Sequence, residues 1–293
     1  MLNNLAEQTD NTMKELMTQT DAPEQLARVQ TLASEGANAT RFLEDFNILT
    51  TMENLQAAKE LLAEDMTVFK DWKRFKSMAT GEEVRLPDFT ESLTDRETMQ
   101  AAYQEFLNDT KNVKAVMQHD PVMTRYDVKA IKKMDVGVRF MNRLCKREFY
   151  QIPVDTGADI VQMNVTILSK GEETSRVRVE IPTEHLGKVS AEATVQEGRL
   201  KCFVSSDTRE GTQALKERRL NLFAVLAENQ VEIGSIFYGT EEVTNDSYTY
   251  RTDGIYKESQ GSEDTDGTDN RTMYRIAKSL VTHVRNADAD FQQ

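Results

Sequence analysis

The sequence predicts an α+β protein, with an N-terminal all-α helical region followed by a small α+β domain whose mixed or antiparallel sheet packs on one long helix. Three patterns predict this class. Apolar residues recur at helical spacing through residues 1–150, strand-like alternation follows between residues 159 and 204, and helical spacing returns over residues 208–229. Separate helical and strand regions, rather than a regular βαβ alternation, are typical of the α+β class.

Residues 1–150 are predicted to be a helical bundle or a set of helical hairpins. The expected helices cover a first segment around residues 5–17, then residues 22–35, a segment around 39–46, one continuous apolar stripe over 51–80, residues 94–119 and residues 124–145. Thr94 and Glu97 form a capping box, and Gly81 and Pro121 mark helix ends. The segment 82–93 is predicted to be a loop.

Residues 151–245 are predicted to be the α+β domain, and residues 147–157 its boundary. Strands are expected over residues 159–168, 177–181, 189–195, 200–204 and, briefly, 231–236. Glu197-Gly198 predicts a hairpin turn, because glycine accepts a positive φ. The apolar residues Leu215, Leu222, Phe223 and Leu226 have the spacing of one face of a single helix over residues 208–229.

Residues 246–293 are predicted to be a flexible acidic linker and an amphipathic tail helix. Residues 244–270 are rich in Ser, Thr, Gly, Asp and Glu, which favours flexibility. The tail helix has one apolar face, formed by Met273, Ile276, Leu280, Val281 and Val284. This face is expected to dock either on the protein itself or on a partner.

The net charge of −13 argues against nucleic acid as a partner, because phosphate binding needs clustered Lys and Arg. A basic protein surface suits such a chain better. The sequence has no apolar run of the roughly 20 residues needed to span a bilayer, so membrane insertion is not expected. It also shows no secretory signal peptide, and we expect a cytoplasmic protein whose export, if it occurs, needs no cleaved signal.

The cysteines and histidines do not predict a cofactor or metal site. Cys145 and Cys202 fall in different predicted domains and are expected to be buried thiols in a reducing compartment. His119, His185 and His283 lie in three separate segments and share no ligand spacing. We therefore expect neither a zinc site nor a nucleophile–base pair.

The region 177–236 contains the segment Ile181-Pro182-Thr183-Glu184-His185-Leu186-Gly187-Lys188-Val189, then the Glu197-Gly198 turn, the long helix and a short strand. This order resembles the C-terminal domain of flagellar hook-length control proteins, over about a fifth of the chain. The residues that carry the resemblance are packing and turn positions: Pro182, Leu186, Gly187, Val189, Gly198, Leu215, Leu222 and Leu226. Ala191 and Ala193 depart from the pattern, where larger β-branched residues are usual.

The resemblance implies a non-enzymatic component of the flagellar type III export system. Proteins of that family are exported themselves and, through this domain, contact the cytoplasmic domain of the export switch protein, which ends hook export and starts filament export. Residues 151–245 would carry this contact, with hook or hook-cap subunits as further candidate partners. The helical region would replace the usual measuring segment, because it lacks the Pro-rich character common in the family.

Two other functions are alternatives. A non-flagellar adaptor or scaffold protein would show the same helical stripes and acidic charge. Asp155-Thr156-Gly157 resembles the active-site loop of retroviral-type aspartic proteases, in which the Asp shares a proton with a second Asp. The sequence shows no flap, however, and the alternative interpretation of these residues is a turn before a strand.

Two charged segments remain. The segment 264–269 resembles a calcium loop, but its glycine is misplaced and Arg275 stands where a glutamate ligand is needed, which favours a solvated acidic tail. Lys216, Arg218 and Arg219 lie on the polar side of the predicted long helix. They form either a solvated face or a contact for acidic groups of a partner.

Overall fold

The computed structural model describes residues 35–63, 67–155, 159–170, 174–228, 232–240 and 268–291. These residues belong to two compact units, Met1–Leu62 and Ala63–Gln293. The division falls after Leu62, whereas the sequence predicts a boundary near residue 150. The helices predicted before residue 35, and the linker residues 244–267 predicted to be flexible, lie outside the described residues.

The described part of the first unit contains a helix over residues 35–45 and α3 (Met52–Leu62). The rings of Phe42 and Phe46 pack together with their centroids 4.6 Å apart. The side-chain amide of Asn54 in α3 donates to the backbone oxygen of Leu49, in the connection between the helices, at 2.6 Å. Both described segments of this unit are helical, and Leu43 and Leu61 are among their buried residues.

The second unit is built on a six-stranded sheet in which the strands lie side by side in chain order. The strands are β1 (Phe149–Asp155), β2 (Ile160–Lys170), β3 (Thr174–Pro182), β4 (Lys188–Gln196), β5 (Arg199–Ser206) and β6 (Glu232–Thr240). The first five strands are antiparallel, and β6 is parallel to β5. Parallel pairing needs a crossover, which α8 (Arg209–Glu217) and α9 (Arg219–Ala227) supply. The predicted α+β class and mixed sheet are confirmed.

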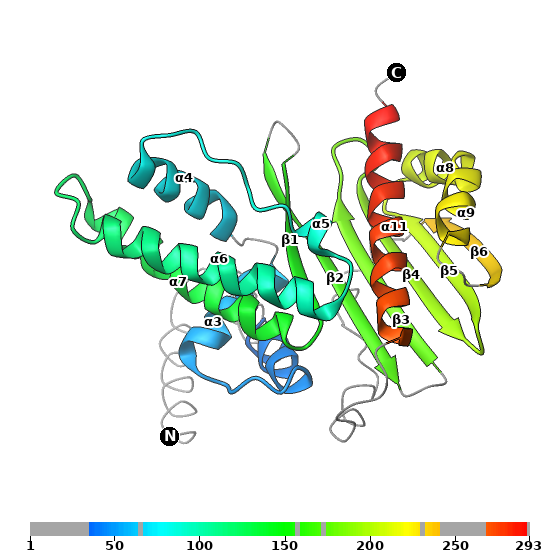
Figure 1. Ribbon diagram of the computed structural model, residues 1–293, viewed down its shortest axis with the longest axis horizontal. Coiled ribbons are helices and arrows are strands. Elements are labelled where there is room, and N and C mark those ends of the chain that lie inside the picture. Colours follow the sequence, from blue (N-terminus) through cyan, green and yellow to red (C-terminus); the bar gives the residue numbers. More distant parts are fainter. Residues whose placement is uncertain are drawn as a thin grey trace, which may run out of the picture. The chain divides into compact units, whose positions relative to one another are not determined.

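One face of the sheet carries the core, because inward-facing residues alternate along each strand. α11 (Thr268–Asp290) packs across β3 on this face and also contacts β4 and α9 (Figure 1). Ala191 and Ala193 of β4 are buried opposite Val179 and Val177 of β3. Small side chains leave room for the helix that covers this face. This explains why alanines stand at these two positions, where the family pattern has larger β-branched residues.

The tail helix docks on the protein itself. The predicted apolar face of α11 is fully buried, including Ile276, Leu280 and Val284. The single helix predicted over residues 208–229 is wrong: the chain leaves helical geometry at Arg218, with φ −91 and ψ 14, and forms α8 and α9 instead. The long helix on the sheet is therefore α11, which comes from the end of the chain.

The remaining helices of this unit form a layer beside β1. α6 (Arg96–Met117) and α7 (Arg125–Cys145) form a hairpin, α4 (Val68–Thr80) packs on both, and α7 and the short α5 (Phe89–Ser92) contact β1 (Figure 1). The N-cap of α6 is Asp95, which accepts the backbone N–H of Thr98 at 2.8 Å, rather than the predicted Thr94. None of the helices that the structure describes is long and apolar enough to cross a membrane.

Residues 147–157, predicted to be a boundary, contain strand β1 with Pro153 inside it. The hydroxyl of Tyr103 donates to the backbone oxygen of Gln151 at 2.7 Å and accepts its N–H at 2.8 Å, so these backbone groups point away from β2. Pro153 lies two residues after Gln151, so its backbone groups point to the same outer edge of the strand. The N–H that proline lacks would therefore not have bonded to β2. A proline is tolerated there because no ladder hydrogen bond is lost.

Two helix boundaries also differ from the prediction. The apolar stripe over residues 51–80 is divided between α3, which ends at Leu62, and α4, which begins at Val68, and the intervening sequence contains neither Gly nor Pro. The predicted loop 82–93 contains α5, whose N-cap Asp88 accepts the backbone N–H groups of Thr90 and Glu91. Gly81 ends α4 in the left-handed conformation, as its position predicts.

Candidate partner-binding surface

The residues that carry the family resemblance lie in the interior or in turns. Leu186, Val189, Leu215, Leu222 and Leu226 are all fully buried. Pro182 ends β3, and Gly187 and Gly198 have φ values of +75° and +73° in the two turns that flank β4. These positions specify how the strands and helices pack, so any partner contact has to be made by other residues.

The turn between β3 and β4 is fixed by the start of α8. The backbone oxygen of Leu186 accepts the hydroxyls of Ser206 at 2.5 Å and Thr208 at 3.2 Å. Asp207 accepts the backbone N–H of Lys188 at 2.9 Å, and a Cβ atom on Gly187 would come within 2.0 Å of the same carboxylate oxygen. Glycine is therefore required here both for its φ and for its lack of a side chain.

The end of α11 holds the same turn from the other side. The carboxylate of Asp288 accepts the backbone N–H groups of Glu184, His185 and Leu186 at 3.2, 2.9 and 3.2 Å. The imidazole ring of His185 stacks on the ring of Phe291. His185 therefore joins the β3–β4 turn to the C-terminal segment through both its backbone and its ring.

Of the three cations predicted for partner binding, Lys216 and Arg219 are exposed, whereas Arg218 forms an ion pair with Asp290 of α11 at 3.6 Å. Arg218 also lies near His283, a buried residue of α11. Burial lowers the pKa of His283 to about 4, and the charge of Arg218 contributes in the same direction. Lys216 and Arg219 are therefore the two cations available to a partner, while Arg218 links α9 to α11.

Apolar side chains are exposed on α9 and on the opposite face of the neighbouring strands. On α9, Leu220 is 72% exposed and Phe223 is partly exposed. The sequence predicted Phe223 on the buried face, but of these α9 residues only Leu222 and Leu226 face the core. On the other face of the sheet, Phe203 of β5 and Phe237 of β6 are register partners that are 46% and 59% exposed.

These groups surround an edge strand. α9 packs against β6, and among the described residues no strand pairs with the outer edge of β6. A bulge at Gly234 brings Ile233 and Ile236, three residues apart, opposite Leu200 and Cys202. No charged residue or proline occurs between Ile233 and Thr240, although such residues commonly protect edge strands. We call this region, formed by Lys216, Arg219, Leu220, Phe223, Phe203 and β6, the β6–α9 surface.

The exposure of Phe203 and Phe237 was not predicted from the sequence. A signal was present for Phe203, because Leu200, Cys202 and Val204 face the core and the residue between the last two must face outward. For Phe237 the bulge at Gly234 shifts the alternation of β6. Its orientation could not be derived without knowing the position of the bulge.

The protease-like and calcium-like segments are only partly described. Asp155 is the last residue of β1, is exposed, and lies 3.5 Å from Lys73 of α4, while Thr156 and Gly157 lie outside the described residues. Residues 264–267 also lie outside, and Asp269 belongs to α11. Within the described ranges, no group of three or more His, Cys, Asp or Glu residues could hold a metal ion.

The two cysteines are buried and separate, Cys145 in α7 and Cys202 in β5. Burial raises the pKa of each thiol to about 12, which keeps both thiols protonated at neutral pH. His119 lies in the loop after α6, apart from His185 in the β3–β4 turn and His283 in α11. Neither a scan against protein-family models nor searches of curated proteins and of solved structures finds a match for this chain.

Proposed function

We propose that this protein acts in flagellar hook-length control and in switching the substrate specificity of the type III export apparatus, through protein–protein contact. The observation that carries this proposal is the β6–α9 surface. It lies mostly within the region of family resemblance and combines exposed apolar side chains, two exposed cations that form no ion pair with the described residues, and the outer edge of a strand. Such a combination of apolar anchors and a polar rim is typical of protein interfaces.

The contact would use two chemistries. Leu220 and Phe223 supply apolar area on α9, and Lys216 and Arg219 can meet carboxylates of a partner. The outer edge of β6 offers backbone groups that an extended segment can pair with. The candidate partner is the cytoplasmic domain of the export switch protein, and hook or hook-cap subunits are further candidates.

Binding rather than catalysis is favoured by the state of the reactive groups. Asp155 faces a lysine of α4, and both cysteine thiols are buried with raised pKa values. An acid that shares a proton with a second carboxylate, or a thiolate nucleophile, would need a different environment. We place the protein in the cytoplasm, with export through the type III apparatus as the route by which it leaves.

A binding titration tests the proposal. The full chain is titrated with the purified cytoplasmic domain of the export switch protein from the same organism, using wild type, Leu220→Asp and Leu49→Asp. Leu49 is a matched control, because it is a similarly exposed leucine, at 78%, in the other unit. Leu220→Asp is expected to weaken binding by roughly tenfold or more, as for a buried interface anchor, and Leu49→Asp to leave it unchanged.

Absence of binding by the folded wild-type chain would contradict the flagellar assignment and favour an adaptor with another partner. Equal losses for the two leucine variants would remove the β6–α9 surface from the interface.

A further inference from the structure

A second exposed apolar group lies at the end of the α6–α7 hairpin, far along the chain from the β6–α9 surface. Val116, Val122 and Tyr126 all face solvent here, and the last two are each 75% exposed. They come from the last turn of α6, the connecting loop and the first turn of α7. Figure 1 shows this end of the hairpin projecting away from the sheet.

The segments that carry these apolar side chains are also rich in cations. Between residues 111 and 133 the chain carries six Lys or Arg and two Asp, although its total net charge is −13. Lys111, Arg125, Lys129 and Lys132 are exposed and form no ion pair with the described residues. We call this group, with Val116, Val122 and Tyr126, the hairpin tip.

The basic residues of the neighbouring helix α4 differ from these cations. Each of its basic residues is paired with a carboxylate of another element: Lys70 with Asp159, Lys73 with Asp155, Arg74 with Asp127 and Lys76 with Asp109. The cations of the hairpin tip thus differ from those of α4, and their positive charge remains available.

The two Asp residues of the tip are engaged within the chain. Asp120 accepts the backbone N–H of Val122 at 2.9 Å. Asp127 forms a capping box with Thr124 and accepts the guanidinium of Arg74 at 3.0 Å. The pKa of Asp127 is lowered mainly by the hydrogen bonds from Thr124, and further by the hydrogen bond and the positive charge of Arg74. Asp127 therefore stays ionised and in place.

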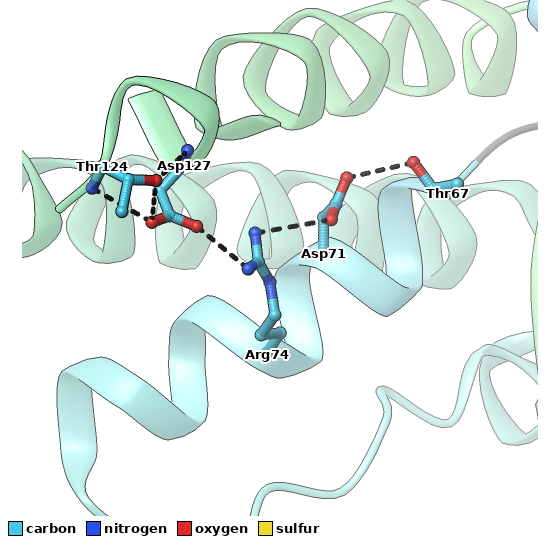
Figure 2. A network of polar contacts seen from close by, with 5 residues as sticks. All are labelled: Thr67, Asp71, Arg74, Thr124 and Asp127. Atoms are coloured by element: carbon cyan, nitrogen blue, oxygen red, sulfur yellow. Dashed lines mark hydrogen bonds and ion pairs between the residues drawn. The ribbon is translucent and has the colours of Figure 1, made fainter. Parts of the chain in front are cut away.

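The same contacts hold the tip in one conformation. Figure 2 shows Arg74 between Asp127 of α7 and Asp71 of its own helix, with Asp71 in turn bonded to the hydroxyl of Thr67. The first turn of α7 is thereby fixed to α4. Because the loop is already held in one conformation, its exposed apolar side chains can bind a partner without a further loss of conformational entropy.

We propose that the hairpin tip is a peripheral binding site for a lipid bilayer that contains anionic phospholipids. Val122 and Tyr126 would enter the interfacial layer, where tyrosine is favoured, and Lys111, Arg125, Lys129 and Lys132 would meet the phosphate groups. A projecting tip fits a flat, deformable surface better than it fits the flat or projecting face of a folded protein. This site is independent of the β6–α9 surface.

The test is co-sedimentation of the full chain with vesicles of phosphatidylcholine alone and with vesicles that also contain phosphatidylglycerol. We expect binding only to the anionic vesicles, and weaker binding at high salt, because exposed charges are screened. The double variant Lys129→Gln with Lys132→Gln should bind about 25-fold more weakly, because each cation contributes about fivefold. Val122→Ser with Tyr126→Ser should also weaken binding.

A charge-matched control, Lys201→Gln with Arg209→Gln, removes two exposed cations from β5 and α8. It should bind like the wild type, and thermal unfolding should show that all three variants are folded. Equal weakening by this control, or no binding to anionic vesicles by the wild type, overturns the proposal. Binding to soluble polyglutamate without binding to vesicles also overturns it, and would assign the tip to an acidic protein partner.

Discussion

The carboxylate of Asp288, in the last turns of α11, accepts the backbone N–H of Leu186 in the β3–β4 turn at 3.2 Å, across 102 residues of sequence. The two residues join the tail helix to a turn inside the family-like region. The same carboxylate accepts the N–H groups of His185 and Glu184. The tail helix is thus part of the structural support of this region, and not a separate appendage.

Removing this carboxylate should destabilise the protein. Asp288→Ala leaves the N–H groups of His185 and Leu186 without their charged acceptor in a partly buried turn. We expect a loss of about 1 to 3 kcal/mol in the free energy of unfolding, measured by urea titration. Asp290→Ala is the control, because it removes only the partly exposed ion pair with Arg218 and should cost less than about 1 kcal/mol. A similar loss for both variants would contradict this role of Asp288.

The two turn glycines form a matched pair. Gly187 and Gly198 both have positive φ, but a Cβ atom would clash with Asp207 only at Gly187, since nothing lies within 4 Å at Gly198. Gly198→Ala should therefore cost only the backbone strain, about 1 kcal/mol, and Gly187→Ala should cost clearly more. Equal unfolding midpoints for the two variants would show that the Asp207 contact is unimportant.

Truncation of the buried leucines tests the core. Leu186→Ala and Leu222→Ala each remove a fully buried side chain, and a loss of about 2 to 5 kcal/mol is expected from the lost burial and the remaining cavity. Leu220→Ala removes an exposed leucine from the same helix as Leu222 and should change the stability little. If Leu220→Ala were as destabilising as Leu222→Ala, the orientation of α9 would be wrong.

His283 should make stability depend on pH. Its pKa is lowered from 6.5 to about 4 in the folded protein, so the unfolded chain binds more protons between these values. Stability should therefore fall as the pH drops from about 6.5 to 4, by up to about 3 kcal/mol from this residue. The buried Nε2 atom forms no hydrogen bond with the described residues, so His283→Phe should be tolerated at neutral pH.

The measurement is urea unfolding of wild type and His283→Phe at several pH values. Carboxylates contribute to both proteins, so the informative quantity is the difference between the two curves. The variant should lose less stability on acidification than the wild type. Parallel curves would mean that His283 is not held neutral by its surroundings.

Local patterns predicted much of the fold. The alternation of Val177 with Val179, and of Leu200 with Cys202, predicted β3 and β5 because side chains alternate in direction along every strand. β1 could not be predicted in the same way. A proline is tolerated in a strand only where its backbone nitrogen points away from the neighbouring strand, and the sequence does not show on which side of Pro153 that neighbour lies. The break at Arg218 was also hidden, because no Gly or Pro interrupts the helical pattern there.

The candidate surface was predictable only in part. Lys216 and Arg219 were found as charged residues on a helix, and the structure leaves both exposed. The pairing of Arg218 with Asp290 could not be foreseen, because it depends on where α11 docks, and the tail helix pattern does not specify its target. For the same reason the exposure of Phe223 and Phe237 required the tertiary structure.

Hook length tests the central claim most directly. The gene is deleted in the source organism, and hooks are measured by electron microscopy, without complementation and with wild type, Leu220→Asp or Leu49→Asp. The proposed function predicts overlong hooks without filaments in the deletion strain, restored by wild type and Leu49→Asp but not by Leu220→Asp. Hooks of normal length that carry filaments in the deletion strain would contradict it, and the likeness to hook-length control proteins would then be one of fold alone.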